Sequence, residues 1–277
     1  MQQHTPGSET EETHAMPTLF DLTGKVAIVT GSTKGIGLAI ARRMAEHGAT
    51  VVVSSRKADV CEAVAADIRA DGGKAVVIPC HVGRKEELQA LVDKTVAQCG
   101  GIDIVVANAG INPYFGPAAG ASDEVFDRIM GTNVRSNFWL ANMTCPHMAA
   151  RGGGSFIVIS SIAGIVGQPK IGMYGISKAA DMALIRNIAV EWGPQNVRAN
   201  AIVPGLVRTD FARALWEDPE RYKRTTSSAP LQRIGEPDEI AGAAVYLASP
   251  AASFTTGHSL VIDGGVTIGT VAPSEGQ

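Results

Sequence analysis

The chain has 277 residues, of which 45% are hydrophobic and 18% are charged, which is enough apolar material for a large buried core. The formal net charge is −3 and no block of Lys and Arg occurs, so the composition disfavours nucleic-acid binding. No apolar run approaches the roughly 20 residues of a membrane-spanning helix, so we expect no membrane partner.

The N-terminal segment and the cysteines indicate a compartment. Residues 1–18 are polar, lack a secretory signal pattern and have too little apolar content to pack, so we expect a disordered tail and a cytoplasmic protein. The cysteines form no Cys-x-x-Cys pair, and we interpret them as buried free thiols. The six histidines show no metal-ligand spacing, so we predict no metal site. The four cysteines are Cys61, Cys80, Cys99 and Cys145.

From residue 19 to about residue 265, short β-branched runs alternate with amphipathic stretches of helical period. Near-continuous apolar strands separated by helices are typical of a parallel sheet that is covered on both faces. The pattern contains no linker and no internal repeat. We therefore predict one α/β domain over residues 19–277, a doubly wound Rossmann-type fold with a seven-stranded parallel sheet and helices on both faces. The predicted strands are residues 25–30, 50–55, 74–79, 103–107, 155–160, 197–203 and 259–262.

The first predicted strand runs into a glycine-rich turn with the spacing G-x-x-x-G-x-G, and we expect the following helix to begin near Leu38. Glycines let backbone amides approach a pyrophosphate, and the helix N-terminus adds its partial positive charge. Alternatively, these residues form only a tight turn without a ligand. The turn follows the first strand of a chain that alternates strands and helices, and this position favours a nucleotide-binding site. The candidate cofactor residues here are Gly31, Ser32, Thr33, Lys34, Gly35, Ile36 and Gly37.

The end of the second strand bears on the choice of cofactor. An NAD site places Asp or Glu there for the ribose 2′-hydroxyl, whereas this chain has Ser55 and Arg56. Arg56 can bind a 2′-phosphate through two hydrogen bonds, and Lys34 can reach it from the glycine turn. Alternatively, Arg56 is a solvated residue at the start of the next helix. We expect NADP(H) to be preferred, with NAD(H) possible.

Two segments interrupt the alternation where strands end, which is where ligands bind in such sheets: residues 111–121 and 205–236. We expect them to wall a substrate pocket, with a lid around residues 205–236. Their large apolar side chains either line the pocket or pack the lid against the sheet. Arg208, Arg213 and Lys223 either bind an anionic substrate or are exposed helix charges. The candidate pocket residues are Tyr114, Phe115, Phe211, Leu215 and Trp216.

Tyr174 and Lys178 lie four residues apart on the helix predicted after the fifth strand, so they share one helical face. A phenol is a poor acid–base group at neutral pH, and a nearby ammonium favours its ionised form. Ser161 follows the fifth strand and brings a hydroxyl to the same crevice, where it and Tyr174 would stabilise a developing alkoxide. We interpret the neighbouring Ser160 as a strand-terminating residue.

Several motifs in chain order resemble the short-chain dehydrogenase/reductase family over about residues 20–265. They are TGSTKGIG (30–37), ANAG (107–110), GTNVRSN around Asn133, SSIAG (160–164), YGISK (174–178) and IVPGLVRT (202–209). The segments VVVSSRK (51–57), CHVG (80–83), NPYFG (112–116) and RGGGS (151–155) are similar to its NADPH-dependent carbonyl/retinal reductase branch. The scaffold also resembles 3-oxoacyl-thioester reductases.

This resemblance implies roles for individual residues. Asn133, Ser161, Tyr174 and Lys178 resemble the catalytic tetrad, in which Asn133 would bend its helix and hold a relay water near Lys178. Lys178 would also hold the nicotinamide ribose. The further cofactor contacts that the resemblance implies are His81, Val82, Asn108, Ala109, Gly110, Tyr174, Pro204, Gly205, Leu206, Val207 and Thr209.

The chain departs from the family pattern at two positions. Ala107 replaces a frequent Asn, which removes one packing hydrogen bond. After the third strand the run Cys80-His81-Val82 lacks the Asp that usually contacts adenine, and the backbone amide of Val82 remains as a contact.

We therefore predict an NADP(H)-dependent oxidoreductase that transfers a hydride between nicotinamide and a carbonyl or secondary alcohol. A 3-oxoacyl-ACP or CoA reductase and an NAD-dependent alcohol dehydrogenase remain alternatives. A cofactor-binding redox sensor is the non-enzyme alternative, although such proteins usually lose the Tyr or the Lys. The family resemblance implies a homotetramer, with which the apolar stretches over residues 122–149 and 174–192 are compatible.

Overall fold

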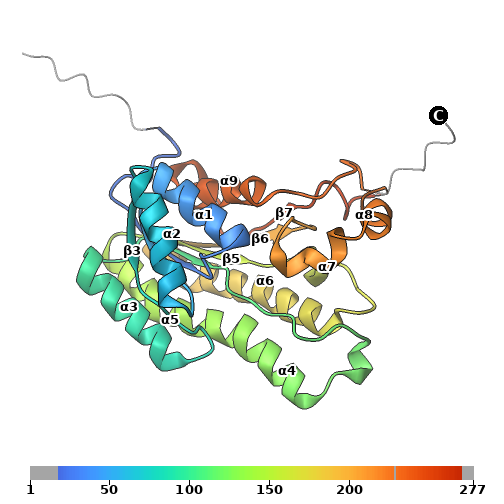
Figure 1. Ribbon diagram of the computed structural model, residues 1–277. Coiled ribbons are helices and arrows are strands. Elements are labelled where there is room, and N and C mark those ends of the chain that lie inside the picture. Colours follow the sequence, from blue (N-terminus) through green and yellow to red (C-terminus); the bar gives the residue numbers. More distant parts are fainter. Residues whose placement is uncertain (1–17, 228, 270–277) are drawn as a thin grey trace, which may run out of the picture.

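The structure is a computed structural model that describes residues 18–227 and 229–269 (Figure 1). The tail predicted over residues 1–18 lies outside the described residues except for Thr18. Within the described part of the chain, no helix is long and apolar enough to cross a membrane. The same residues contain no group of three His, Cys, Asp or Glu side chains that could hold a metal ion.

Seven parallel strands form one sheet in the order β3-β2-β1-β4-β5-β6-β7, which confirms the predicted fold class. Every predicted strand is present, and its ends agree within about two residues, the usual spread of boundary assignments. The strands are β1 Val26–Thr30, β2 Thr50–Ser54, β3 Lys74–Val77, β4 Ile104–Ala107, β5 Gly154–Ile159, β6 Val197–Pro204 and β7 Ser259–Ile262.

Both faces of the sheet are buried, which is why the strands read as continuous apolar runs. In β1, Ala27 and Val29 pack into one core cluster, whereas Val26 and Ile28 pack into the other. Helices α1, α2 and α9 cover the first face, and α3, α5 and α6 cover the second (Figure 1). These helices are α1 Gly35–Glu46, α2 Ala58–Ala70, α3 Lys85–Cys99, α5 Ser136–Ala150, α6 Gly172–Trp192 and α9 Pro237–Ala248.

The strand order reverses beside β1. The chain leaves β1 for β2 and β3 on one side and returns with β4 on the other side. The connections that follow β1 and β4 therefore diverge, and such a switch point opens a crevice at the carboxyl ends of the strands. The glycine turn and residues 108–116 both begin at this point.

A buried carboxylate fastens the opposite, amino-terminal end of β4. Asp103 is 4% exposed and accepts a hydrogen bond of 2.8 Å from the backbone N–H of Val26. It also accepts two hydrogen bonds, of 2.9 and 3.1 Å, from the guanidinium group of Arg151. Asp103 therefore ties β4 to β1 at the end of the sheet that faces away from the crevice.

The segment between β6 and α9 forms short helices instead of a regular crossover. They are the 3₁₀ helix η5 Asp210–Ala212, α7 Arg213–Trp216 and α8 Pro219–Thr226. Figure 1 shows α7 and α8 at one end of the molecule, apart from the helices that cover the sheet. That place suits the predicted lid.

All four cysteines are free thiols, as expected from their spacing. Cys61, Cys80 and Cys145 are buried, and Cys99 is half-buried. Burial raises the pKa of each thiol, to about 12 for Cys80 and Cys145, so little reactive thiolate forms at neutral pH.

Candidate active site

The glycine turn forms a tight cradle between β1 and α1. Helix α1 begins at Gly35, three residues before the predicted start at Leu38, so that prediction was wrong. Gly31 and Gly35 have positive φ angles of 66° and 55°, which favour glycine. A Cβ atom on Gly37 would lie 2.4 Å from the carbonyl oxygen of Gly31 and 2.4 Å from Nδ2 of Asn108. This close packing fixes the turn beside the first N–H groups of α1, which have no intrahelical partner and can bind an anion such as a pyrophosphate.

Asn108, just after β4, holds this turn in place. Its Nδ2 donates to the carbonyl oxygens of Thr30 at 2.9 Å and Gly31 at 3.2 Å. The backbone N–H groups of Asn108 and Ala109 both donate to Oγ1 of Thr30 at 3.1 Å. Asn108 therefore joins the two connections at the switch point, and its side-chain nitrogen is bound to the protein.

The Ser32 hydroxyl is also committed to the fold. It is fully buried, accepts a hydrogen bond of 2.8 Å from the N–H of Ser54 and donates to the carbonyl oxygen of Ser54 at 3.4 Å. Oγ of Ser54 itself is buried without a hydrogen-bond partner among the described residues. The end of β2 thus presents an unsatisfied polar atom beside the glycine turn, which fits a polar ligand there.

Two basic side chains flank the same edge. Lys34, the last residue before α1, and Arg56, just after β2, are exposed, whereas Ser55 is half-buried. Neither Lys34 nor Arg56 forms an ion pair with another described residue. Their charges are therefore available to a ligand phosphate.

A carboxylate that was not predicted from the sequence lies beside the segment that follows β3. Glu87, in the first turn of α3, accepts a hydrogen bond of 2.7 Å from the backbone N–H of His81. Nδ1 of His81 accepts from the N–H of Gly83 at 3.2 Å. The His81 N–H and then Arg84 hold the pKa of Glu87 below its ordinary value. His81 and Val82 are half-buried, and their contact with adenine stays a prediction.

The end of β5 and the start of α6 bring Ser161, Tyr174 and Lys178 into one corner. Nζ of Lys178 lies 5.7 Å from the centre of the Tyr174 ring and donates to the carbonyl oxygen of Ile159 at 2.8 Å. The Ser160 hydroxyl donates to the carbonyl oxygen of Lys178 at 2.8 Å, which supports its structural interpretation.

Ser161 follows Ser160 and precedes the 3₁₀ helix η3 Ile162–Gly164, which packs on the first turn of α6. A Cβ atom on Gly175 would lie 2.5 Å from the carbonyl oxygen of Ala163, so the two segments nearly touch. The Ser161 hydroxyl accepts from the N–H of Ala163 at 3.2 Å. This corner adjoins the switch point, because a Cβ atom on Gly110 would lie 3.7 Å from Nζ of Lys178.

Asn133 lies in a π-helical turn, η2 Gly131–Arg135, between α4 Asp123–Met130 and α5. Its amide is fully buried, accepts from the N–H of Ile111 at 2.8 Å and donates to the carbonyl oxygen of Ile111 at 3.0 Å. It also donates to Oγ of Ser177 at 3.0 Å. Asn133 therefore holds the segment after β4 against α6, and its widened helical turn fits the expected distortion of the helix.

Two buried polar residues near Lys178 escaped the sequence analysis. Oδ2 of Asp181 lies 3.2 Å from Nζ of Lys178, and Oδ1 of Asp181 accepts from Nδ2 of Asn137 at 2.9 Å. Burial lowers the pKa of Lys178, but the electrostatic effects of the Asp181 carboxylate and then of the Tyr174 phenol outweigh burial and raise it. Lys178 is therefore an ammonium ion at neutral pH.

The apolar residues predicted to line a substrate pocket separate into two groups. Phe211 faces the catalytic corner, with its ring centre 6.0 Å from that of Tyr174. Phe115 instead lies 5.7 Å from Nζ of Lys170, and Nε1 of Trp216 donates to the carbonyl oxygen of Thr209 at 3.0 Å. Tyr114 donates to the carbonyl oxygen of Pro117 at 2.9 Å. Only Phe211 among these four has a contact with Tyr174 in the described structure, and Leu215 lies on α7.

The segment after β6 reaches the glycine turn. A Cβ atom on Gly35 would lie 3.1 Å from the methyl group of Thr209, so Thr209 sits beside the cradle. Pro204 ends β6, and Val207 forms a bridge with Gly235. Of the predicted cofactor residues of this segment, Thr209 therefore lies at the crevice, and the cofactor contacts of the others stay predictions.

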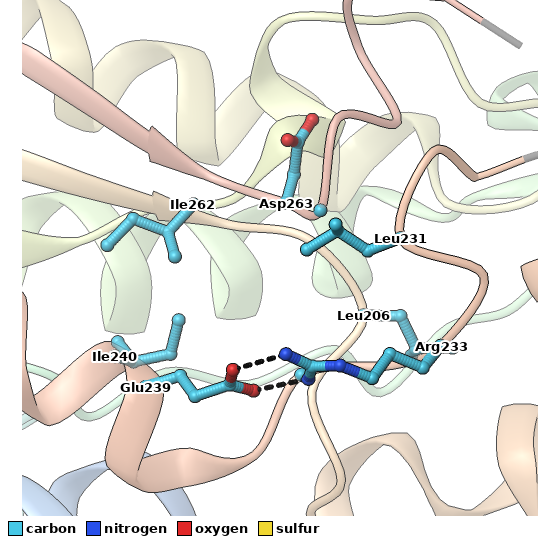
Figure 2. Close-up of a pocket in the computed structure, with 9 residues that line it drawn as sticks. Leu206, Leu231, Arg233, Glu239, Ile240, Ile262 and Asp263 are labelled. Atoms are coloured by element: carbon cyan, nitrogen blue, oxygen red, sulfur yellow. Dashed lines mark hydrogen bonds and ion pairs between the residues drawn. The ribbon is translucent and has the colours of Figure 1, made fainter.

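A small cavity of about 80 Å³ lies between this segment, β7 and α9 (Figure 2). In Figure 2, Arg233 binds Glu239 through two hydrogen bonds, of 2.7 and 2.6 Å. Arg233 and then the N–H of Glu236 lower the pKa of Glu239 to about 2, so the pair is ionic at neutral pH. No candidate catalytic residue lines this cavity, and we assign it to the packing of the segment.

The comparisons with known proteins identify the family of the chain. The family model described as enoyl-(acyl carrier protein) reductase matches residues 31–267. "Dehydrogenase/reductase SDR family member 4" of Bos taurus is 44% identical over 244 residues, covering 88% of each chain.

Two solved structures show the same fold. A 7α-hydroxysteroid dehydrogenase complexed with NADH and 7-oxo glycochenodeoxycholic acid is 37% identical, with a TM-score of 0.86 over 92% of this chain and 98% of the other. A gluconate 5-dehydrogenase from Burkholderia cenocepacia in complex with NADP and tartrate is 34% identical, with a TM-score of 0.87 over 90% and 98% of the two chains. The chain is therefore an oxidoreductase that belongs to the short-chain dehydrogenase/reductase family.

Proposed function

We propose that this oxidoreductase uses NADPH to reduce a small apolar ketone or aldehyde to the alcohol. The observation that carries the proposal is the corner at the end of β5, where a charged, buried Lys178 lies beside Tyr174 and next to the switch-point crevice. Phe211 supplies an apolar wall beside the Tyr174 ring.

When it is bound, the dihydronicotinamide supplies the hydride. The residues of this chain handle the oxygen. Tyr174 donates its phenolic proton to the carbonyl oxygen, and Ser161 donates a hydrogen bond to the same atom. The Lys178 ammonium stabilises the phenolate that remains and would also hold the ribose of the nicotinamide cofactor. Asn133 positions the segment after β4 and α6 around them.

Turnover of the wild-type protein tests this function. With NADPH and a panel of aromatic and aliphatic ketones and aldehydes, we expect nicotinamide absorbance to fall, with higher kcat/KM than for an acetoacetyl thioester. Arg208 pairs with Glu236 and Arg213 pairs with Asp210, so these charges are engaged within the segment instead of facing a phosphopantetheine. A clear preference for the thioester would make the 3-oxoacyl reductase the correct function. NADPH binding without turnover on any compound would favour the redox sensor.

The preference for NADP(H) rests on the end of β2. Lys34 and Arg56 offer free positive charge there, and neither Ser54 nor Ser55 is a carboxylate that would repel a 2′-phosphate. The Burkholderia relative holds NADP and the hydroxysteroid dehydrogenase holds NADH, so family membership leaves both cofactors open.

We expect Arg56→Asp to weaken NADPH binding by roughly 10- to 100-fold, because it removes a charge-assisted contact and adds repulsion. NADH binding should change little. The measurement is the dissociation constant of each cofactor by calorimetry. Lys94→Asp makes the same charge change on the exposed surface of α3 and should leave the NADPH to NADH ratio unaltered. An unaltered ratio in Arg56→Asp would show that Arg56 does not bind the 2′-phosphate.

We further propose a homotetramer. Phe126, Phe138, Ile176 and Val190 are large apolar side chains that are between 43% and 81% exposed on α4, α5 and α6. An open hollow of about 490 Å³ beside Phe138 and Trp139 lies on the same helices. Exposed apolar side chains gathered on neighbouring helices support burial against another subunit.

A further inference from the structure

A buried ion pair lies directly behind the catalytic corner. The side chains of Lys178 and Asp181 are 4% and 0% exposed, and Nζ of Lys178 is 3.2 Å from Oδ2 of Asp181. The other carboxylate oxygen accepts a hydrogen bond of 2.9 Å from Asn137. Each oxygen thus faces a donor, an arrangement that the ionised carboxylate satisfies and that an acid proton would disrupt.

The carboxylate is anchored to the rest of the site through Asn137. Nδ2 of Asn137 also donates to the carbonyl oxygen of Asn133 at 2.6 Å, inside the π-helical turn. The Asn133 amide in turn donates to Oγ of Ser177, which donates to the carbonyl oxygen of Tyr174 at 2.7 Å. Asp181 is therefore fixed by α5 and η2 and does not depend on its own helix alone.

Burying the acidic side chain of Asp181 costs folding free energy. Asp181 lies on the face of α6 that also buries Met182 and Ile185, and burial raises the pKa of its carboxyl group. An apolar side chain would fill such a place without a desolvation penalty. The contact with Lys178 offsets this penalty. The effect of Asp181 should therefore be measured on the protonation of Lys178 and its partner Tyr174.

The charge balance of the corner depends on this residue. Among the described residues, the charged or titratable groups that act on Lys178 are Asp181 and Tyr174, both on α6. The neighbours from other elements are neutral: the carbonyl of Ile159 on β5, the Asn133 amide on η2 and the Asn137 amide on α5. With Asp181 ionised and Tyr174 protonated, the three groups sum to zero charge. Without the carboxylate they carry one positive charge.

We propose that Asp181 is a positioning residue whose carboxylate holds the Lys178 ammonium in place and balances its charge, so that the Tyr174–Lys178 pair keeps both protons at neutral pH. This is the form that can protonate a carbonyl oxygen, so Asp181 raises the pH at which the form that accepts a proton from an alcohol appears. The inference rests on the proposed function of Tyr174 and Lys178.

The variant that tests it is Asp181→Asn, which keeps the shape and removes the charge. In this variant the Tyr174–Lys178 pair has a net positive charge in a buried site. It therefore loses its first proton more easily than it does in the wild-type protein, where the Asp181 carboxylate makes the three groups neutral. We expect the midpoint of the pH–rate profile for alcohol oxidation to move to lower pH by about one unit or more. An unmoved midpoint in a folded Asp181→Asn protein overturns the proposal.

Asp103→Asn is the matched control. It also breaks a buried Asp ion pair, with Arg151, but at the amino-terminal end of β4. It should lower the thermal stability and leave the pH–rate midpoint where it is. If Asp103→Asn shifted the midpoint as much as Asp181→Asn does, the shift would be due to lost stability, and this result would also overturn the proposal.

A second measurement on the wild-type protein covers the case in which Asp181→Asn does not fold. With isotope-labelled lysine, the ε-carbon NMR signal of Lys178 can be assigned by its loss in Lys178→Met and followed against pH. We expect the pKa of Lys178 to lie above the ordinary lysine value, because the Asp181 carboxylate offsets the burial of the ammonium group. A pKa below the ordinary lysine value overturns the role of Asp181. This measurement does not depend on turnover. It can therefore test the role of Asp181 even if Tyr174 is not the catalytic acid.

Discussion

Replacing Tyr174 by phenylalanine is expected to lower kcat/KM for carbonyl reduction by roughly 10³-fold, because the substitution removes the proton donor and leaves the ring in place. The phenyl ring can still pack against Phe211, whose ring centre is 6.0 Å away. Cofactor binding depends mostly on other residues, so the dissociation constant of NADPH should change little. The measurements are steady-state kinetics and calorimetric titration with NADPH.

Tyr246→Phe is the control for this substitution. The Tyr246 hydroxyl shares a hydrogen bond of 3.0 Å with Oγ1 of Thr255 and lies on α9, away from the end of β5. Loss of that bond should cost about 1 kcal/mol of stability and leave kcat unchanged. If Tyr174→Phe retained a tenth or more of the wild-type activity, the acid would have to be another group.

Gly37→Ala is expected to weaken NADPH binding by on the order of 100-fold, because overpacking typically costs 1–3 kcal/mol. The added methyl group would lie 2.4 Å from the Gly31 carbonyl oxygen and from Nδ2 of Asn108. Relief requires the turn to open and Asn108 to release Thr30 and Gly31. Calorimetry with NADPH and thermal unfolding together measure the effect.

Gly242→Ala provides the matched helical control. Gly242 lies in α9, and a Cβ atom there would meet nothing within 4 Å. Alanine is a better helix former than glycine, so this variant should gain about 0.5–1 kcal/mol of stability and bind NADPH as the wild type does. Wild-type affinity in Gly37→Ala would show that the close packing of the turn is not needed for cofactor binding.

The fold was predictable because burial on both faces leaves a plain pattern in the sequence. Seven continuous apolar runs separated by helical periods are compatible with few architectures besides a covered parallel sheet. The start of α1 was predicted too late because glycine is a poor helix former, so Gly35 and Gly37 were assigned to the turn. In the structure α1 begins at Gly35, which has a positive φ of 55°, and Gly37 lies within the helix, where the close approach of Gly31 and Asn108 leaves no room for a side chain.

The candidate catalytic residues could be located because their spacing along the chain is short and tied to strand ends. The supporting residues could not. Asp181 and Asn137 are 44 positions apart, and nothing in either local sequence indicates the partner. Glu87 likewise binds a backbone N–H, a kind of contact that leaves no signature in side-chain chemistry. For the cofactor candidates Ser32 and Asn108, the sequence could not indicate that Oγ of Ser32 and Nδ2 of Asn108 bind the protein itself, and their contact with a cofactor stays a prediction.

The site depends on the number of residues in the π-helical turn η2 as well as on their identity. An α-helix rotates by about 100° per residue, so the extra residue in a wide turn offsets the phase of α5 from that of α4 by about that angle. This offset aims Asn137 at Asp181 while Phe138 stays half exposed. A substitution between residues 131 and 135 preserves the phase, whereas a deletion of one residue would turn one helix relative to the other. Apart from Asn133, whose amide binds Ile111 and Ser177, the segment can therefore tolerate new side chains far more readily than a new length.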